Sequence, residues 1–170
     1  MAKVSFPVAA DTSYLLRLAE GDEDAWDALE ILRRTFKQCR RIATVTVLRE
    51  LAHHAGNASN LLLAETAHKA LRSLRGQWGF EPGAVQFPLN EDQVEALARD
   101  FLRRGLLPES ERHDAHILAE ATCSKALLLV SEDSHLHDVD DFQLSLCLRR
   151  WKLTPPSILT ARELVKTFGH

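Results

Sequence analysis

The chain has 170 residues, enough for one domain with a sizeable hydrophobic core. Hydrophobic residues make up 45% and charged residues 26%, which is the composition of an ordinary globular protein. The formal net charge of −3 excludes a global basic field of the kind that attracts nucleic acid, although a local basic strip remains compatible with this balance.

Three features of the sequence favour a cytoplasmic protein. Its three cysteines are far apart and form no CxxC pair, so we expect buried thiols in a reducing compartment and neither disulfides nor a zinc knuckle. The N-terminal residues contain no apolar segment of the kind that a signal peptide needs. No apolar run approaches the length that crosses a membrane, so we expect no membrane association.

In the first half of the chain, short apolar runs alternate with amphipathic helices. An apolar run from Phe6 to Ala10 predicts a strand that ends at Asp11. A helix follows, and a second helix over 25–37 begins with acidic and ends with basic residues, as the helix dipole favours. The further elements expected here are a strand at 41–45, helices at 46–54 and 61–75, and a loop over 77–88 with a short extended piece at 85–87.

The second half continues this alternation. Asn90 is placed to cap a helix over 91–104 that Gly105 ends. The run ALLLV at 126–130 is the clearest strand signal in the chain. The remaining predicted elements are helices from Ser110 or Glu111 to Cys123, at 139–150 and at 161–168, and a short strand at 157–160. Because strands and helices alternate, the sequence predicts one α/β domain over residues 1–170 with a mostly parallel sheet.

Four acidic residues stand in apolar sequence: Asp11, Glu50, Asp114 and Asp133. A carboxylate next to buried strands is costly to desolvate, and four that converge repel one another unless a divalent cation holds them. Asp11 and Asp133 directly follow predicted strands, at the sheet edge where α/β proteins bind ligands. The pattern therefore predicts a metal-dependent site at this edge.

The other two acids lie on predicted helices. Asp114 begins an apolar stripe at i, i+3, i+4 and i+7, so it is expected to face inward near a helix N-terminus. Glu50 lies one turn into the helix after the second strand and can point back toward the strand ends. Each acid also has a structural alternative: an N-cap for Asp11, a dipole partner for Asp114, a pair with Arg49 or with a neighbouring helix for Glu50, and a turn cap for Asp133.

The order of the motifs DTS, TVTVLRE, ERHDAHILAEA and LLLVSED resembles that of the PIN-domain ribonucleases, especially the VapC-type toxins of toxin–antitoxin modules. The closing segment TPPSILTARELV is similar to the family's last strand and helix, so the resemblance spans about Pro7 to Val165. It implies a single three-layer α/β/α domain whose central, mostly parallel sheet has four or five strands.

The resemblance also implies residue roles. The family's acidic quartet, both catalytic and metal-binding, falls on Asp11, Glu50, Asp114 and Asp133. Accessory positions near the metal fall on Ser13, Ser131 and Asp138, and His113 beside the third acid is placed to contact a substrate phosphate. Asp138 is alternatively part of the start of the next helix. The segment SEDSHLHDVDDF departs from the family, in which an aromatic residue closely follows the last acid, and this leaves the alignment beyond Asp133 open.

The chemistry implied is hydrolysis of RNA. One or two Mg²⁺ or Mn²⁺ ions held by carboxylates orient a water molecule, lower its pKa and neutralise charge on a phosphodiester. In the family this implies endonucleolytic cleavage that leaves a 5′-phosphate. RNA binding also needs cations at the phosphates, and the candidates are Arg40, Arg41, Lys69, Arg72 and Arg75. A solvated helix surface is the alternative for each of these clusters.

The sequence disfavours several other functions. The chain lacks GxxxxGK[ST] and GxGxxG, and Ser13 stands where an aspartyl phosphatase has its second Asp. The histidines near Asp114 and Asp133 suggest a transition-metal site, but no HExxH or Cys/His spacing supports it. Two alternatives stay open, a PIN-like RNA-processing nuclease outside a toxin module and a non-catalytic PIN-like scaffold. For a toxin, the resemblance implies an RNA substrate, a cognate antitoxin protein and a homodimer.

Overall fold

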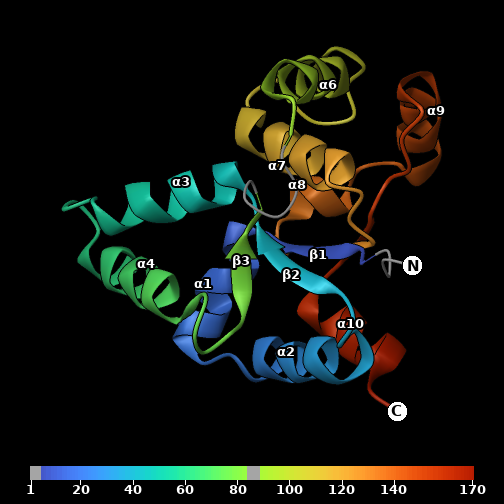
Figure 1. Ribbon diagram of the computed structural model, residues 1–170. Helices are drawn as coiled ribbons and strands as arrows, with labels where there is room; N and C mark the ends of the chain where they lie inside the picture. Colours follow the sequence, from blue (N-terminus) through green and yellow to red (C-terminus); the bar gives the residue numbers. More distant parts are fainter. Residues whose placement is uncertain (1–4, 84–88) are drawn as a thin grey trace.

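The structure, a computed structural model, describes residues 5–83 and 89–170 (Figure 1). Its strands are β1 (Pro7–Ala10), β2 (Arg40–Ala43), β3 (Phe80–Pro82), β4 (Leu128–Val130) and β5 (Ser157–Leu159). Its helices in the first half are α1 (Thr12–Glu20), α2 (Glu23–Thr35), α3 (Val45–Ala55) and α4 (Leu61–Ser73). Those in the second half are α6 (Glu91–Arg103), α7 (Arg112–Cys123), α8 (Ser134–His137), α9 (Asp141–Trp151) and α10 (Ala161–Phe168).

The five strands form one parallel sheet in the order β3–β2–β1–β4–β5. The central strand β1 places Ala9 opposite Ile42 of β2 on one side and opposite Leu129 of β4 on the other. Every residue of β1 and β4 is buried, which is why both are apolar without alternation. The predicted α/β fold with a central parallel sheet is confirmed.

Helices cover both faces of this sheet. In Figure 1 α6 and α7 lie above it, α2 and α10 lie below it, and the α3–α4 hairpin projects to the left. Tyr14 of α1, Phe80 of β3 and Phe101 of α6 are among the largest fully buried side chains. The carboxyl ends of β1, β2 and β4 open onto the starts of α1, α3 and α8, and the predicted site belongs at this edge.

Two segments differ from the sequence-based expectation. The region expected to be loop contains β3, in which Phe80 pairs with Arg41; the extended piece expected at 85–87 lies outside the described residues. The helix expected over 139–150 begins only at Asp141, because the side chain of Asp140 caps it by accepting from the Gln143 backbone N–H. A separate short helix, α8, precedes it and went unrecognised in the sequence.

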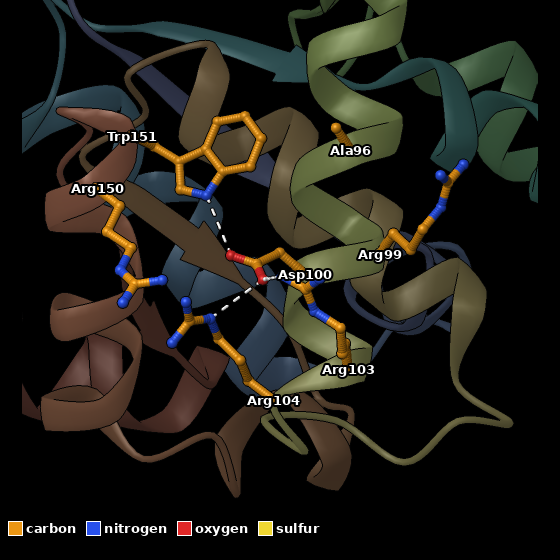
Figure 2. A pocket seen from close by; sticks show the side chains of 7 residues that line it. All are labelled: Ala96, Arg99, Asp100, Arg103, Arg104, Arg150 and Trp151. Carbon is orange, nitrogen blue, oxygen red and sulfur yellow. Dashed lines mark hydrogen bonds and ion pairs between the residues drawn. The ribbon is translucent and has the colours of Figure 1, made fainter.

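Helix α9 is tied to α6 by a buried carboxylate (Figure 2). One oxygen of Asp100 accepts from the Trp151 indole N–H at 3.2 Å and from the Cys147 thiol at 3.4 Å. Cys147 is buried, and all three cysteines of the chain are free. In the part of the chain that is described, no helix has the length and apolarity needed to cross a bilayer.

Candidate active site

Asp11 lies at the end of β1 and is 3% exposed. It occupies the N-cap position of α1, but its side chain makes no capping hydrogen bond. Instead, Oδ2 accepts from the Ser13 hydroxyl at 2.6 Å and from the Ser131 hydroxyl at 2.8 Å. Burial raises the pKa of Asp11, and these two hydroxyl groups oppose that rise. The side chain of Asp11 therefore does not cap α1, and its role in a site stays a prediction.

The two serines join the ends of neighbouring strands around this carboxylate. The Glu132 backbone N–H donates to Ser13 Oγ at 2.9 Å, and the Asp133 N–H donates to Ser131 Oγ at 3.0 Å. Each hydroxyl thus donates to Asp11 and accepts from the turn after β4. The position of Asp11 and the path of the chain before α8 are fixed together.

Glu50 reaches this edge from the first half of α3. One of its oxygens accepts a hydrogen bond from the Thr12 hydroxyl, and the other lies 3.1 Å from Nδ1 of His113. The ion pair with Arg49 that the sequence left open is not among the contacts of the described residues. Because Thr12 follows Asp11 directly, Glu50 is held beside the first acid.

The surroundings of Asp114 also oppose its ionisation. Its residue is 7% exposed, and the buried Oδ2 has no hydrogen-bond partner among the described residues. Burial is the largest cause of a rise of its pKa to about 8, and the charges of Asp133, Asp11, Glu111 and Glu50 add to the rise in that order. The other three predicted acids therefore lie within electrostatic reach of Asp114.

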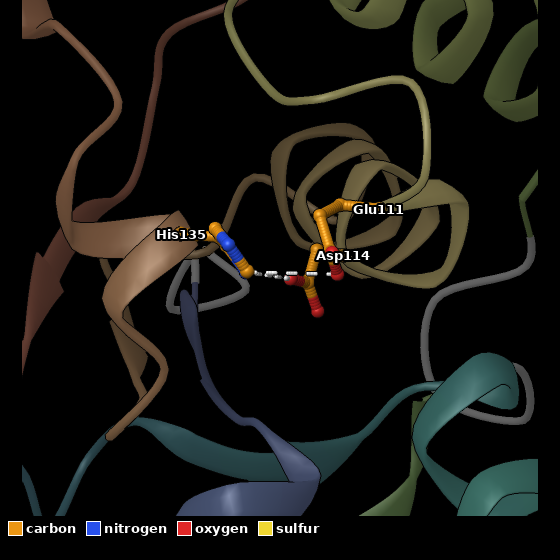
Figure 3. Close-up of side chains that lie close together, drawn as sticks. All are labelled: Glu111, Asp114 and His135. Atoms are coloured by element: carbon orange, nitrogen blue, oxygen red, sulfur yellow. Dashed lines mark ion pairs between the residues drawn. The ribbon is translucent and has the colours of Figure 1, made fainter.

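A second set of ligand atoms surrounds Asp114 (Figure 3). Nδ1 of His135 lies 3.9 Å from Asp114 Oδ2, 3.6 Å from Glu111 Oε2 and 3.5 Å from Asp133 Oδ1. Glu111, Asp114 and His135 each offer one ligand atom, and these atoms lie within 4.8 Å of one another. Among the described residues, the ligand atoms of Glu111, Asp114 and His135 are close enough together to hold one ion. Asp11, Glu50 and Asp133 are not part of this set.

Sequence reasoning missed Glu111 and gave His135 no role with the acids. Glu111 stands three residues before Asp114 on the same face of the chain entering α7, so helical spacing could have identified it. His135 depends on α8, whose first turn is capped by Asp133 through a 2.7 Å hydrogen bond from the His135 N–H. Asp133 thus serves as the turn cap that the sequence left open and also faces the cluster.

Two further acids, one buried and one partly buried, position the elements that carry the site. Glu120 of α7 is 6% exposed and accepts from both the backbone N–H and the hydroxyl of Thr46 at the start of α3. Glu132 accepts from the Ala161 N–H at 2.7 Å and so caps α10 on the side away from Asp133. Neither was predicted, because their partners are distant in sequence.

The predicted accessory acid Asp138 and the predicted RNA-binding cations lie on different elements of the fold. Asp138 is exposed and ends α8 at its C-cap. Arg40 pairs with Glu81 at 3.8 Å, and Arg41 donates to the Trp78 carbonyl at 3.2 Å. The exposed candidates on α4 and the turn after it are Lys69, Arg72 and Arg75. Their role in RNA binding stays a prediction.

A hollow of about 480 Å³ opens beside Glu50, between α3 and α7. It is rich in imidazole groups, with one arginine at its wall. Its lining residues are Thr46, Arg49, Glu50, His53, His54, His113 and His116. The hollow therefore presents hydrogen-bond donors next to the carboxylate cluster.

Comparison with known proteins shows which solved structure has a similar fold. No family profile matches the sequence, and no curated protein matches it. Among solved structures, a chain of VapBC2 from Rickettsia felis, determined bound to a DNA fragment from its promoter, is similar with a TM-score of 0.58 at 13% identity. The similarity covers 91% of this chain and 98% of that one. At this identity it shows an α/β PIN-like fold and nothing finer.

Proposed function

We propose that this chain is a divalent-metal-dependent endoribonuclease that hydrolyses RNA phosphodiester bonds. The observation that carries the proposal is the state of Asp114. Its buried carboxylate oxygen has no hydrogen-bond partner among the described residues, and burial together with four neighbouring acids raises its pKa to about 8, so its ionisation is costly without a cation. Its place at the carboxyl edge of a parallel sheet is where such folds bind ligands.

The residues present fit a divalent cation. Glu111 and Asp114 offer the carboxylate oxygens that Mg²⁺ and Mn²⁺ prefer, and the His135 nitrogen favours Mn²⁺ over Mg²⁺. Asp133 faces the same imidazole from α8. When bound, one or two such ions supply an activated water and neutralise the charge that develops on the phosphodiester.

The side chains around this set hold and orient the substrate. Asp11 is fixed by its two serine hydroxyls, so its second oxygen keeps a defined direction. Glu50, held by Thr12 and His113, marks the border between the carboxylates and the histidine-lined hollow. Arg49 and the imidazole N–H groups of that hollow can donate to phosphate oxygens of the strand.

We further propose that the chain, a single domain over residues 1–170, is the toxin of a type II toxin–antitoxin pair in the cytoplasm, with a cognate antitoxin and a homodimeric state. The likeness of its fold to a chain of a VapBC complex supports this proposal. Growth arrest on expression, relieved by the product of a neighbouring gene, tests it. Growth without arrest favours the RNA-processing nuclease.

The nuclease proposal is tested by RNA cleavage in Mg²⁺ or Mn²⁺, with and without EDTA. Asp11→Asn and Asp114→Asn are expected to reduce cleavage by at least about a hundredfold, because metal-site ligands and their neighbours contribute on that scale. Asp24→Asn, an exposed acid in the first turn of α2, is the matched control. Cleavage that survives both substitutions contradicts the site, and metal binding without cleavage of any RNA favours the scaffold.

A further inference from the structure

A second hollow, of about 400 Å³, lies between α6 and α9 and carries an excess of positive charge (Figure 2). Four arginines and one carboxylate line it, an excess of three positive charges in a chain whose net charge is −3. The lining residues are Ala96, Arg99, Asp100, Arg103, Arg104, Arg150 and Trp151. Its volume is in the range of small-ligand sites, about 300–1,000 Å³.

Asp100 organises this hollow. Its side chain is 8% exposed; one oxygen accepts from Arg103 at 2.6 Å and Arg104 at 3.1 Å, and the other accepts from the Trp151 indole. Burial opposes its ionisation, but the hydrogen bonds hold the pKa of Asp100 at about 2. The carboxylate is therefore charged at neutral pH, and it preorganises two guanidinium groups and an indole.

The arginines keep donors for a ligand. The Arg103 side chain is 76% exposed, although one of its nitrogens contacts Asp100. Arg99 pairs with the exposed Glu95 at 3.3 Å, and surface pairs of this kind contribute little. Arg150, from α9, is exposed and takes part in no ion pair within the described ranges. Three guanidinium groups from two helices can thus turn toward an anion.

We propose that this hollow binds the backbone of single-stranded RNA, with Arg99, Arg103 and Arg150 on phosphates and a base against the Trp151 indole. Arginine suits phosphate because its planar fork donates two parallel hydrogen bonds. Proteins bind single-stranded RNA with a cationic groove for the phosphates and an aromatic side chain on which a base stacks. An acidic peptide has no base to stack, so the indole beside the arginines favours RNA. The inference rests on the proposed function in its choice of RNA as ligand.

The test is equilibrium binding of a fluorescein-labelled single-stranded RNA, measured by anisotropy in EDTA so that no cleavage occurs. Arg99→Gln/Arg103→Gln/Arg150→Gln is expected to bind about tenfold more weakly. The slope of log affinity against log salt should fall by about 2, because each lost phosphate contact removes about 0.7.

The charge-matched control is Arg34→Gln/Arg162→Gln/Lys166→Gln, on α2 and α10. These helices lie on the other side of the sheet from α6 (Figure 1), and the three side chains are exposed. Because the control removes the same net charge from another face, it is expected to bind within about twofold of the wild type.

Two substitutions of Trp151 separate stacking from support of Asp100. Trp151→Phe keeps an aromatic ring but removes the N–H that donates to Asp100. Trp151→Ala removes both, and it is expected to weaken binding about tenfold while the Phe variant stays near the wild type. If both variants weaken binding equally, the indole acts through Asp100 and the stacking contact is wrong.

The outcomes distinguish this site from the nuclease proposal. RNA affinity and salt slope unchanged in the arginine variant overturn the RNA site, even if Asp114-dependent cleavage is observed. Arginine-dependent binding without cleavage supports the site and contradicts the nuclease. If a polyglutamate peptide displaces the RNA as effectively as unlabelled RNA, the hollow takes an acidic protein segment instead.

Discussion

At the residue scale, two serines hold the first acid in place. Ser13 and Ser131 stood out in the sequence through family resemblance alone, and the structure gives them a physical task. Both donate to the same oxygen of Asp11, and both accept a backbone N–H from the turn after β4. A buried carboxylate with two donors remains easier to ionise than one in an apolar pocket.

Ser13→Ala and Ser131→Ala are each expected to lower the free energy of unfolding by about 1–2 kcal/mol, because a buried acceptor loses a donor. RNA cleavage should fall as well, since Asp11 is then less well oriented. Ser145→Ala, at an exposed position of α9, is the control for the loss of a hydroxyl. Urea unfolding measures the effect, and stability equal to that of the control would show that the two hydrogen bonds contribute nothing.

Asp114→Asn tests the raised pKa of this carboxyl in the metal-free protein. The pKa is about 8 in the folded state and 3.8 for an aspartate without tertiary contacts, so folding favours the protonated form. This stabilisation is complete below about pH 4 and is lost as the pH rises through 8. The wild type should therefore lose about 1–3 kcal/mol between these limits, and the Asn variant should lose less. Parallel pH profiles of wild type and variant would contradict the cited shift.

At the element scale, the edge strand β3 depends on a tight turn at Gly79. This glycine has φ +70°, and an added Cβ would lie 2.6 Å from Nη2 of Arg41. Arg41 meanwhile donates to the Trp78 carbonyl. The turn at Gly79, the side chain of Arg41 and strand β3 thus depend on one another, whereas the sequence predicted only a loop here.

Gly79→Ala is expected to destabilise the protein by about 2 kcal/mol. About half of this comes from the left-handed backbone, which costs a non-glycine residue about 1 kcal/mol. Gly105→Ala is the matched control, because its φ is also +70° but no atom lies within 4 Å of the added Cβ. Equal losses in the two variants, measured by urea unfolding, would mean that Arg41 moves aside at no cost.

At the scale of the whole molecule, the proposed function predicts that a divalent cation binds the acids at the sheet edge and relieves the repulsion between their charges. An ion that binds only the folded state at a concentration a hundred times its dissociation constant adds about 2.7 kcal/mol of stability. For a chain of this length, that is a rise in Tm of about 5–10 °C.

Mn²⁺ is therefore expected to raise the Tm of the wild type and to leave Asp114→Asn nearly unchanged. The ion must displace the proton from Asp114, whose pKa is about 8, so the rise should shrink as the pH falls below that value. Calorimetry at two pH values measures this, with Asp24→Asn as the control. A rise of equal size in Asp114→Asn would place the ion elsewhere.

The sequence by itself determined four of the five strands, most helices, a mostly parallel sheet, and the place of Asp11 and Asp133 directly after two strands. These follow from local periodicity and from the rule that ligands meet the carboxyl ends of strands. It could not place β3, α8, or the partners of Asp100 and Glu120. The pairing of β3 and the contacts of Asp100 with Trp151 and of Glu120 with Thr46 join residues far apart in the chain, whereas α8 has only four residues, too few for a periodic signal.

Only the tertiary structure decided which atoms lie close together. In the structure, Glu111 and His135 lie beside Asp114, and the hydroxyls of Ser13 and Ser131 donate to Asp11. Arginines of α6 and α9 line the hollow around Asp100. Burial and neighbouring charge raise the pKa of Asp11 and of Asp114, and both causes depend on packing in three dimensions. The residue types could be read from the chain, but the cost of ionising these two carboxyls arises only from their burial and from the convergence of their neighbours.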